Sequence, residues 1–382
     1  MIRRSLVPIG AAVLAALGAL GGGCSEASVA PSDEPSPDSG TVTPPRDGAA
    51  GDARAVSRDC GADRARGMAQ HLECAGLYVD LAGKRVVDGT LSFTPGVELW
   101  SDGAEKERFI QLPPGATIDT SDMDEWVFPV GTRLWKEFKV AGKRIETRLF
   151  EKTADGWQHA TYRWDEAETE ATRDEDGDTV QLPGRTPYEV PKREDCEFCH
   201  AGRREPVLGF EAVSLGLASA KGVTLASLAS AGRLSAPPPA SVLAIPDDGT
   251  GLAAPALGWL HANCGHCHNE SPNAGAVGSS LRMLVRASEL SAGGGVASAR
   301  DLATWATGVC RLSERDQPEG GKYLYVAPGA PASSLLAILL GSRAEPGMES
   351  IVTQMPPVLT HQVDVAGKKL VDDWIGALPA CP

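Results

Sequence analysis

Two short segments of this 382-residue chain, residues 196–200 and 264–268, have the pattern Cys-x-x-Cys-His. In this pattern two thiols can bond to the vinyl groups of haem, and the adjoining histidine can ligate the iron, so the porphyrin dictates the spacing. A second copy in the same chain argues against a chance match. We therefore expect two covalently bound haem c groups. The expected attachment and iron-ligating residues are Cys196, Cys199 and His200, and Cys264, Cys267 and His268.

The iron of the second haem needs a ligand on its far side, and Met355 is the predicted one. The thioether sulfur is a soft ligand that raises the potential, and Pro356 after it stiffens the loop that must hold the sulfur. Met348 and His361 are the alternative ligands. Met355 could instead be a core residue that fills a gap, which is the usual role of methionine.

The far ligand of the first haem is not specified by the sequence, because no Met-Pro pair lies between the two motifs. An open position there would favour binding of small molecules or peroxide over electron transfer. His266, between the two cysteines of the second motif, is expected to face outward. The candidate ligands are Met68, Met123, Met283, His71, His159 and His261.

The N-terminus predicts export from the cytoplasm. Arg3 and Arg4 precede an apolar run at residues 6–20, which is too short to span a bilayer comfortably and meets small residues before Cys24. This order resembles a bacterial lipoprotein processing site, and Cys24 is the expected lipidated residue. Cleavage by an ordinary signal peptidase would instead give a soluble periplasmic protein. We expect a lipoprotein at the outer membrane that faces the periplasm or the cell surface.

Composition narrows the classes of partner. Residues 25–58 are rich in Ser, Pro, Asp, Gly and Ala, which predicts a disordered tether. The net charge of −14 argues against binding to nucleic acid and to anionic lipid heads. Contact with a membrane should therefore come only through the lipid anchor.

Four of the nine cysteines are assigned neither to haem nor to lipid, and an even number in an oxidising compartment predicts disulfides. By proximity along the chain, Cys60 should pair with Cys74 and Cys310 with Cys381. Free buried thiols are the competing interpretation, because a sequence alone cannot fix the pairing.

Alternation of residue types predicts strands at 134–140, 144–149 and 157–164, separated by turns at Ala141-Gly142 and Asp155-Gly156. Helical spacing follows at 255–264, 333–340 and 364–378. The expected fold class is multidomain α+β, with an antiparallel β sandwich-like module followed by a mostly helical cytochrome c-type haem region. The expected boundaries are a lipoprotein-type signal peptide at 1–24, the tether at 25–58, the β-rich module at 59–190, the first haem segment at 191–250 and a cytochrome c-like domain at 251–382.

Several short sequence motifs resemble those of a largely uncharacterised bacterial family of secreted dihaem c-type cytochromes. They are Leu99-Trp100-Ser101-Asp102-Gly103-Ala104-x-Lys106, Phe128-Pro129-Val130-Gly131-Thr132, Lys136-Glu137-Phe138, the two Cys-x-x-Cys-His motifs and Met355-Pro356-Pro357. The resemblance covers roughly residues 75 to 380 and implies an N-terminal β module joined to two haem c sites. Some similar proteins accompany or are fused to sugar dehydrogenases, which implies a dehydrogenase as an electron source.

Together these observations predict a periplasm-facing dihaem electron carrier rather than an enzyme, with a dehydrogenase or another cytochrome as its redox partner. The β module would dock that partner or position the haems. Two other functions stay open. A dihaem peroxidase would need one haem with a vacant or displaceable ligand. A secreted lipoprotein without redox function would use both motifs as disulfides or metal clips.

Overall fold

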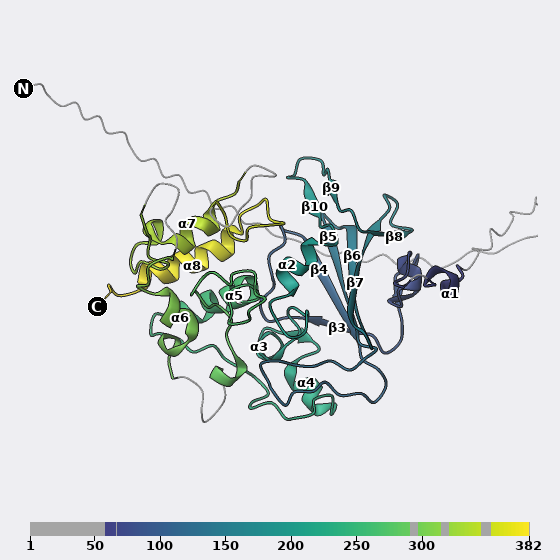
Figure 1. Cartoon of the computed structure of the whole chain (residues 1–382), viewed down its shortest axis with the longest axis horizontal. Helices are drawn as coiled ribbons and strands as arrows, with labels where there is room; N and C mark the ends of the chain where they lie inside the picture. Colours follow the sequence, from purple (N-terminus) through teal and green to yellow (C-terminus); the bar gives the residue numbers. More distant parts are fainter. Residues whose placement is uncertain (1–57, 66, 291–296, 315–320, 345–352, 382) are drawn as a thin grey trace, which may run out of the picture. The chain divides into compact units, whose positions relative to one another are not determined.

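Figure 1 shows the computed structural model of the chain, which describes residues 58–65, 67–290, 297–314, 321–344 and 353–381. The expected signal segment, Cys24, nearly all of the tether and Met348 lie outside the described residues. Val56–Pro382 form one compact unit. Across the described ranges, no helix has both the length and the apolar character needed to cross a membrane.

The largest element is an antiparallel sheet of seven strands in the order β11-β3-β4-β5-β6-β7-β8. Its strands are β3 (Leu91–Thr94), β4 (Glu105–Gln111), β5 (Arg133–Val140), β6 (Lys143–Thr153), β7 (Gly156–Trp164), β8 (Ala171–Asp174) and β11 (Lys221–Gly222). Two separate ladders pair β1 (Tyr78–Asp80) with β2 (Arg85–Val86) and β9 (Asp178–Val180) with β10 (Tyr188–Val190). Because β11 follows the first motif in the chain, residues beyond that motif complete the sheet.

The three longest strands lie where the sequence predicts them. β5 and β6 are joined by Ala141 and Gly142, whose φ angles of 53° and 78° suit the two-residue turn that matches strand twist. Gly156, with a φ of 119°, opens β7 after the second turn. Turn residues with positive φ thus fix both hairpins.

The two faces of the sheet contribute to different cores. Trp135, Leu149 and Tyr162 belong to one face, here called the Trp135 face, and pack with the N-terminal segment around Leu72. The opposite face, the Lys136 face, carries Arg108, Lys136, Arg148, Ile110 and Leu134. Ile110 and Leu134 pack there with residues that follow the first motif, among them Phe210 and Leu215. The Lys136 face therefore lies toward the motifs.

Helices are short and concentrate after the sheet. They are α1 (Cys60–Asp63), α2 (Asp195–His200), α3 (Ala212–Gly216), α4 (Leu225–Ser230), α5 (Ala253–Cys264), α6 (Ala303–Gly308), α7 (Leu335–Gly341) and α8 (Val365–Ala377), with 3-10 turns at Leu72–Cys74, Ala287–Leu290, Ala299–Asp301 and Pro331–Ser333. The helices predicted at 255–264, 333–340 and 364–378 correspond to α5, α7 and α8. Asp364 caps α8 by accepting from the N–H of Gly367 at 2.9 Å, as expected.

The expected fold class is wrong. Helix, with 3-10 turns included, accounts for only 24% of the described residues, and the protein is mostly β rather than a module followed by a mostly helical cytochrome region. Helical periodicity holds only within short segments, and the chain between them forms turns and extended connections. The described strands also form one large sheet and two small ladders, not a sandwich of two large sheets.

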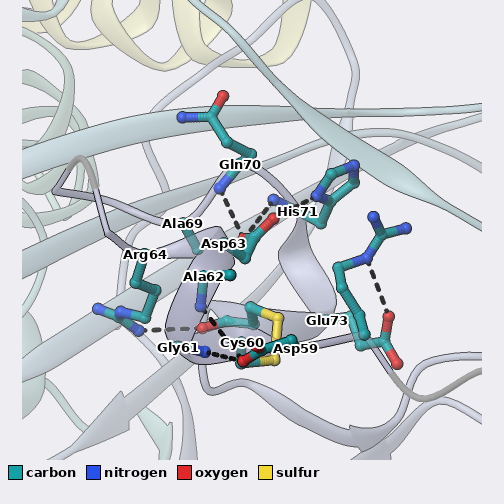
Figure 2. Close-up of a disulfide and its surroundings, with 12 residues drawn as sticks. Asp59, Cys60, Gly61, Ala62, Asp63, Arg64, Ala69, Gln70, His71 and Glu73 are labelled. Carbon is teal, nitrogen blue, oxygen red and sulfur yellow. Dashed lines mark hydrogen bonds and ion pairs between the residues drawn. A yellow bond between two sulfur atoms is a disulfide. The ribbon is translucent and has the colours of Figure 1, made fainter.

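Both predicted disulfides are present, Cys60–Cys74 with Cα atoms 5.1 Å apart and Cys310–Cys381 with Cα atoms 5.8 Å apart. Figure 2 shows the first of them. There Asp59 accepts from the N–H groups of Gly61 and Ala62 at 3.0 and 3.2 Å, and Arg64 donates to the carbonyl of Cys74 at 3.0 Å. Both the disulfide and local hydrogen bonds therefore hold the ends of this loop together.

We expect removal of either disulfide to lower the free energy of unfolding, and more so for the one that closes the longer loop. The sequence separations are 14 and 71 residues, for which the chain-entropy model gives about 3 and 4 kcal/mol. The variants are Cys60→Ala/Cys74→Ala and Cys310→Ala/Cys381→Ala, compared with the native chain by urea denaturation. A loss below about 1 kcal/mol in both would contradict the prediction.

Candidate functional site

The first motif occupies α2, which follows β10 closely. Asp195 and Glu197 place negative charge in its first turn, where the helix dipole favours it. Cys196 is buried, and Cys199 is half-buried one turn later. Because residues three apart share a helix face, both thiols lie on one side of α2. His200 is the last residue of the helix.

The second motif begins at the end of α5. The N–H groups of Cys267 and His268 both donate to the carbonyl of Cys264, at 3.0 and 2.8 Å, so the motif closes into a tight turn. A Cβ added at Gly265 would lie 2.7 Å from the carbonyl oxygen of His261, which leaves no room for a larger residue. The predicted helix that delivers this motif is confirmed.

The histidines of the two motifs are held in the same way. Nδ1 of His200 lies 2.6 Å from the carbonyl oxygen of Pro206, and Nδ1 of His268 lies 3.2 Å from that of Leu281. Since a carbonyl can only accept, the proton is on Nδ1, and Nε2 keeps its lone pair. Burial lowers the pKa of both imidazoles to about 4, so both are neutral at pH 7. This is the arrangement in which proteins present histidine to a metal.

A cavity of about 1200 Å³, its open mouth included, adjoins the second motif. Cys264, Cys267 and His268 line it together with Met355. Most of its remaining wall is apolar and comes from the core around α7. These wall residues include Leu281, Met283, Leu335, Leu336, Leu339 and Leu340. The cavity thus brings the sequence-predicted attachment and ligand residues of the second haem together.

Met355 is held in place by its neighbour. Gln354 is fully buried, its Oε1 accepts from the N–H of Ala344 at 2.8 Å, and its Nε2 donates to the carbonyls of Pro356 and Thr360 at 3.0 Å each. Of the alternatives to Met355, His361 has Nε2 2.7 Å from a carboxylate oxygen of Glu189.

The loop before β4 contacts both sides of this cavity. The N–H of Trp100 donates to Oδ1 of Asn263, the residue before Cys264, at 2.6 Å. The carboxylate of Asp102 accepts from the N–H groups of His361 and Gln362 at 2.7 and 3.1 Å. The β-rich part of the chain therefore fixes the segment that follows Met355 relative to the second motif.

The two motifs are in direct contact with each other. A Cβ added at Gly202, just after the first motif, would lie 2.1 Å from the carbonyl oxygen of His266. The thiol of Cys267 lies 3.8 Å from the carbonyl of Phe198. The thiol of Cys267 donates a hydrogen bond to that of Cys199. This bond lowers the pKa of Cys199 and raises the pKa of Cys267. All four motif cysteines are free thiols, whereas the other four described cysteines are disulfide-bonded.

The prediction that His266 faces outward is wrong. The residue is only 9% exposed, because the contact between the motifs covers it, and it interacts with Cys199. His261, another candidate, is also buried. Its Nδ1 accepts from the N–H of Val285 at 3.1 Å, and its Nε2 lies 3.3 Å from Oε1 of Glu211.

The other candidate ligands of the first haem are dispersed. Met68 belongs to the core on the Trp135 face, Met123 packs in the core around Phe210, and Met283 lines the cavity of the second motif. Nδ1 of His71 lies 2.6 Å from Asp63. Phe150 of β6 stacks on both His159 and His200, with centroids 5.4 and 4.6 Å apart. The structure assigns none of the six to the first haem.

Sequence reasoning missed the part of the sheet that faces the first motif. Arg108, Lys136 and Arg148 lie side by side on the Lys136 face, one on each of three neighbouring strands. Each is visible as a charged residue in a strand pattern, but only the register brings them together.

No protein family, no curated protein and no solved structure matches the chain. The resemblance to dihaem cytochromes therefore stays a prediction. Within the described part of the chain, no cluster of three or more His, Cys, Asp or Glu side chains could hold a bare metal ion. A haem site differs from such a cluster, because the porphyrin itself supplies four of the nitrogen ligands.

We expect Gly202→Ala to lower the free energy of unfolding by about 1–3 kcal/mol, the usual cost of overpacking. The added Cβ would press on a backbone carbonyl, which cannot rotate away. Gly376→Ala is the control, because a Cβ at this exposed position of α8 meets nothing within 4 Å and alanine favours the helix. Equal unfolding free energies of the two variants in urea would show that the motifs are not in close contact.

Proposed function

We propose that this chain is an exported dihaem c-type cytochrome that carries electrons between redox proteins. One observation carries the proposal: a single cavity is lined by both thiols and the histidine of the second motif and, from a distant part of the chain, by Met355. A structural disulfide or a metal clip would require neither the cavity nor the thioether.

The residues around this cavity fit a haem group. Its walls are mainly aliphatic, with a few polar groups among them, as in most ligand pockets. His268 presents a neutral imidazole with Nε2 free, and Met355 lines the same space. When bound, haem would supply an iron that cycles between the ferric and ferrous states.

The surrounding residues would tune that iron. The thioether of Met355 and the aliphatic walls both favour the ferrous state, because neither stabilises the additional positive charge of ferric iron. The carbonyl of Leu281 fixes the orientation of the His268 ring. The buried amide of Gln354 and the carboxylate of Asp102 hold the chain on either side of Met355.

The first motif would hold the first haem in the same way, because its histidine has the same geometry. Nδ1 of His200 lies on the carbonyl oxygen of Pro206. Because Cys199 and Cys267 interact directly, the two porphyrins would be attached next to each other. Such proximity suits rapid transfer of electrons between them. The expected partner is a dehydrogenase or another cytochrome, and lipidation at Cys24 would keep the carrier at the outer membrane.

Mass spectrometry of chain expressed with haem-maturation machinery tests the proposal. We expect the intact protein to carry two haems, and Cys196→Ala/Cys199→Ala and Cys264→Ala/Cys267→Ala to carry one each. The variant Cys60→Ala/Cys74→Ala is the matched control, because it also removes two cysteines and should retain both haems. A native chain with no added mass would refute the proposal.

The same preparations separate the carrier from a peroxidase. Electron paramagnetic resonance of a carrier should show two low-spin ferric centres. High-spin iron at the first motif, with oxidation of the half-reduced protein by peroxide faster than in a simple cytochrome, would instead indicate the enzyme.

We expect Met355→Ala to lower the midpoint potential of the second haem and to abolish the sulfur-to-iron charge-transfer band of the ferric protein. Axial ligands set haem potentials over a range of about 0.8 V, so a decrease on the order of 0.1 V is expected. Met283→Ala is the control, because Met283 lines the same cavity without being the proposed ligand. An unchanged band in Met355→Ala would exclude Met355 as the ligand.

A further inference from the structure

A row of three cations crosses the Lys136 face. In the register of the sheet, Arg108 of β4 is directly opposite Lys136 of β5, which in turn is directly opposite Arg148 of β6. Lys106 lies two residues along β4 on the same face. Like charges that face each other across strands are destabilising, so this arrangement needs an explanation.

Carboxylates of the chain neutralise this row only in part. Arg108 pairs with Glu98 at 2.8 Å, and Arg148 binds both carboxylate oxygens of Glu146 at 2.6 and 2.9 Å. Lys106 donates to the carbonyl of Leu99 at 2.8 Å.

Lys136 is the exception. Among the described residues it makes no hydrogen bond or ion pair, and its ammonium group has only the ring of Phe138, at 5.1 Å, as a specific contact. Burial lowers its pKa well below the usual range, and the positive charges of Arg108, Lys106 and Arg148 lower it further. Lys136 is half-buried, and a cation beside like charges with no carboxylate bound to it is available to an anion.

A shallow cavity, about 530 Å³ with its open mouth included, lies beside these cations. Arg108, Lys136 and Arg203 line it, and its apolar wall includes Val207 and Leu208, which follow the first motif. Glu211 also lines the cavity, but its carboxylate already accepts from the N–H groups of Val213 and Ser214 at 2.7 and 2.6 Å and lies 3.3 Å from His261. Arg203 is paired with Glu125 at 3.0 Å.

The first motif lies against this part of the sheet. Phe150, the neighbour of Arg148 along the same face of β6, stacks on His200 with centroids 4.6 Å apart. Burial raises the pKa of the Cys196 thiol, and the positive charge of Arg148 opposes this rise. Burial lowers the pKa of the His200 imidazole, and the positive charge of Lys136 lowers it further. A haem attached to Cys196 and Cys199 is an apolar ring with two carboxylates on one edge. Such a group matches an apolar wall beside Lys136, to which no carboxylate of the described residues is bound.

We propose that Lys136, together with Arg108, binds the propionate carboxylates of the first haem. This inference rests on the proposed function and adds the orientation of that haem, with its propionate edge toward β4 and β5. The haem carboxylates would then supply the negative charge that the row lacks. They would also make the sheet part of the haem site rather than a separate module.

The test is a redox titration of the holoprotein carrying Lys136→Met, followed by electron paramagnetic resonance to resolve the two haems. Removing a nearby positive charge favours the ferric state, so we expect the ferric-to-ferrous equilibrium of the first haem to change about tenfold, or about 59 mV toward lower potential. The potential of the second haem should change less. Resonance Raman bands of the propionates should also shift, and Lys136→Arg should restore both properties.

Lys369→Met is the matched control, because it removes an exposed lysine of α8 and should alter neither haem. If Lys136→Met does not fold, Arg108→Gln removes a charge from the same row and should lower the same potential. If the first haem is attached and the charge-removing variant that folds titrates like the control, the inference is wrong. Absence of haem from Cys196 and Cys199 would refute the proposed function instead.

A free carboxylate anion could present the same chemistry to this cavity. Adding malonate distinguishes the two sources. With propionates bound to Lys136, malonate should leave the first-haem potential of the native protein unchanged. A malonate-dependent shift that disappears in Lys136→Met would assign the cavity to a free anion and overturn the inference.

Discussion

The site depends on the direct contact between the two Cys-x-x-Cys-His segments. Gly202 lies so close to the carbonyl of His266 that no side chain fits between them. Although 63 residues separate His200 from Cys264, backbone packing fixes the two motifs relative to each other. The loop around Trp100 and Asp102 extends this constraint to the segment after Met355. The distance between any two bound haems would therefore be set by a packed core and not by a linker.

Features that depend on residues near one another in the sequence could be predicted. Ala141-Gly142 and Gly156 determine the hairpins, and helical periodicity located α5, α7 and α8. The disulfides could also be predicted, because only four cysteines remained and proximity along the chain gave the correct pairs. Met355 was singled out by its neighbouring proline, and the structure places it in the cavity of the second motif.

Features set by long-range packing could not be predicted. The fold class was wrong because short periodic segments were taken to indicate a mostly helical region, whereas the chain between them is irregular and β11 returns to the sheet. His266 was expected outside because nothing in its own segment reveals that the first motif covers it. Lys136 looked like an ordinary charged strand residue until the register placed Arg108 and Arg148 on either side of it.

These cations also explain why a large sheet accompanies the motifs. Local rules favour opposite charges or apolar pairs across strands, and proteins tend to break such rules at functional sites. Arg108, Lys136 and Arg148 break the rule at the centre of the sheet, where the neighbouring strands hold the side chains in place. A short helix such as α2 could not hold three cations in a row, because its residues turn away from one another. The sheet can, and so it gives the first motif a charged wall while the core around α7 gives the second an apolar one.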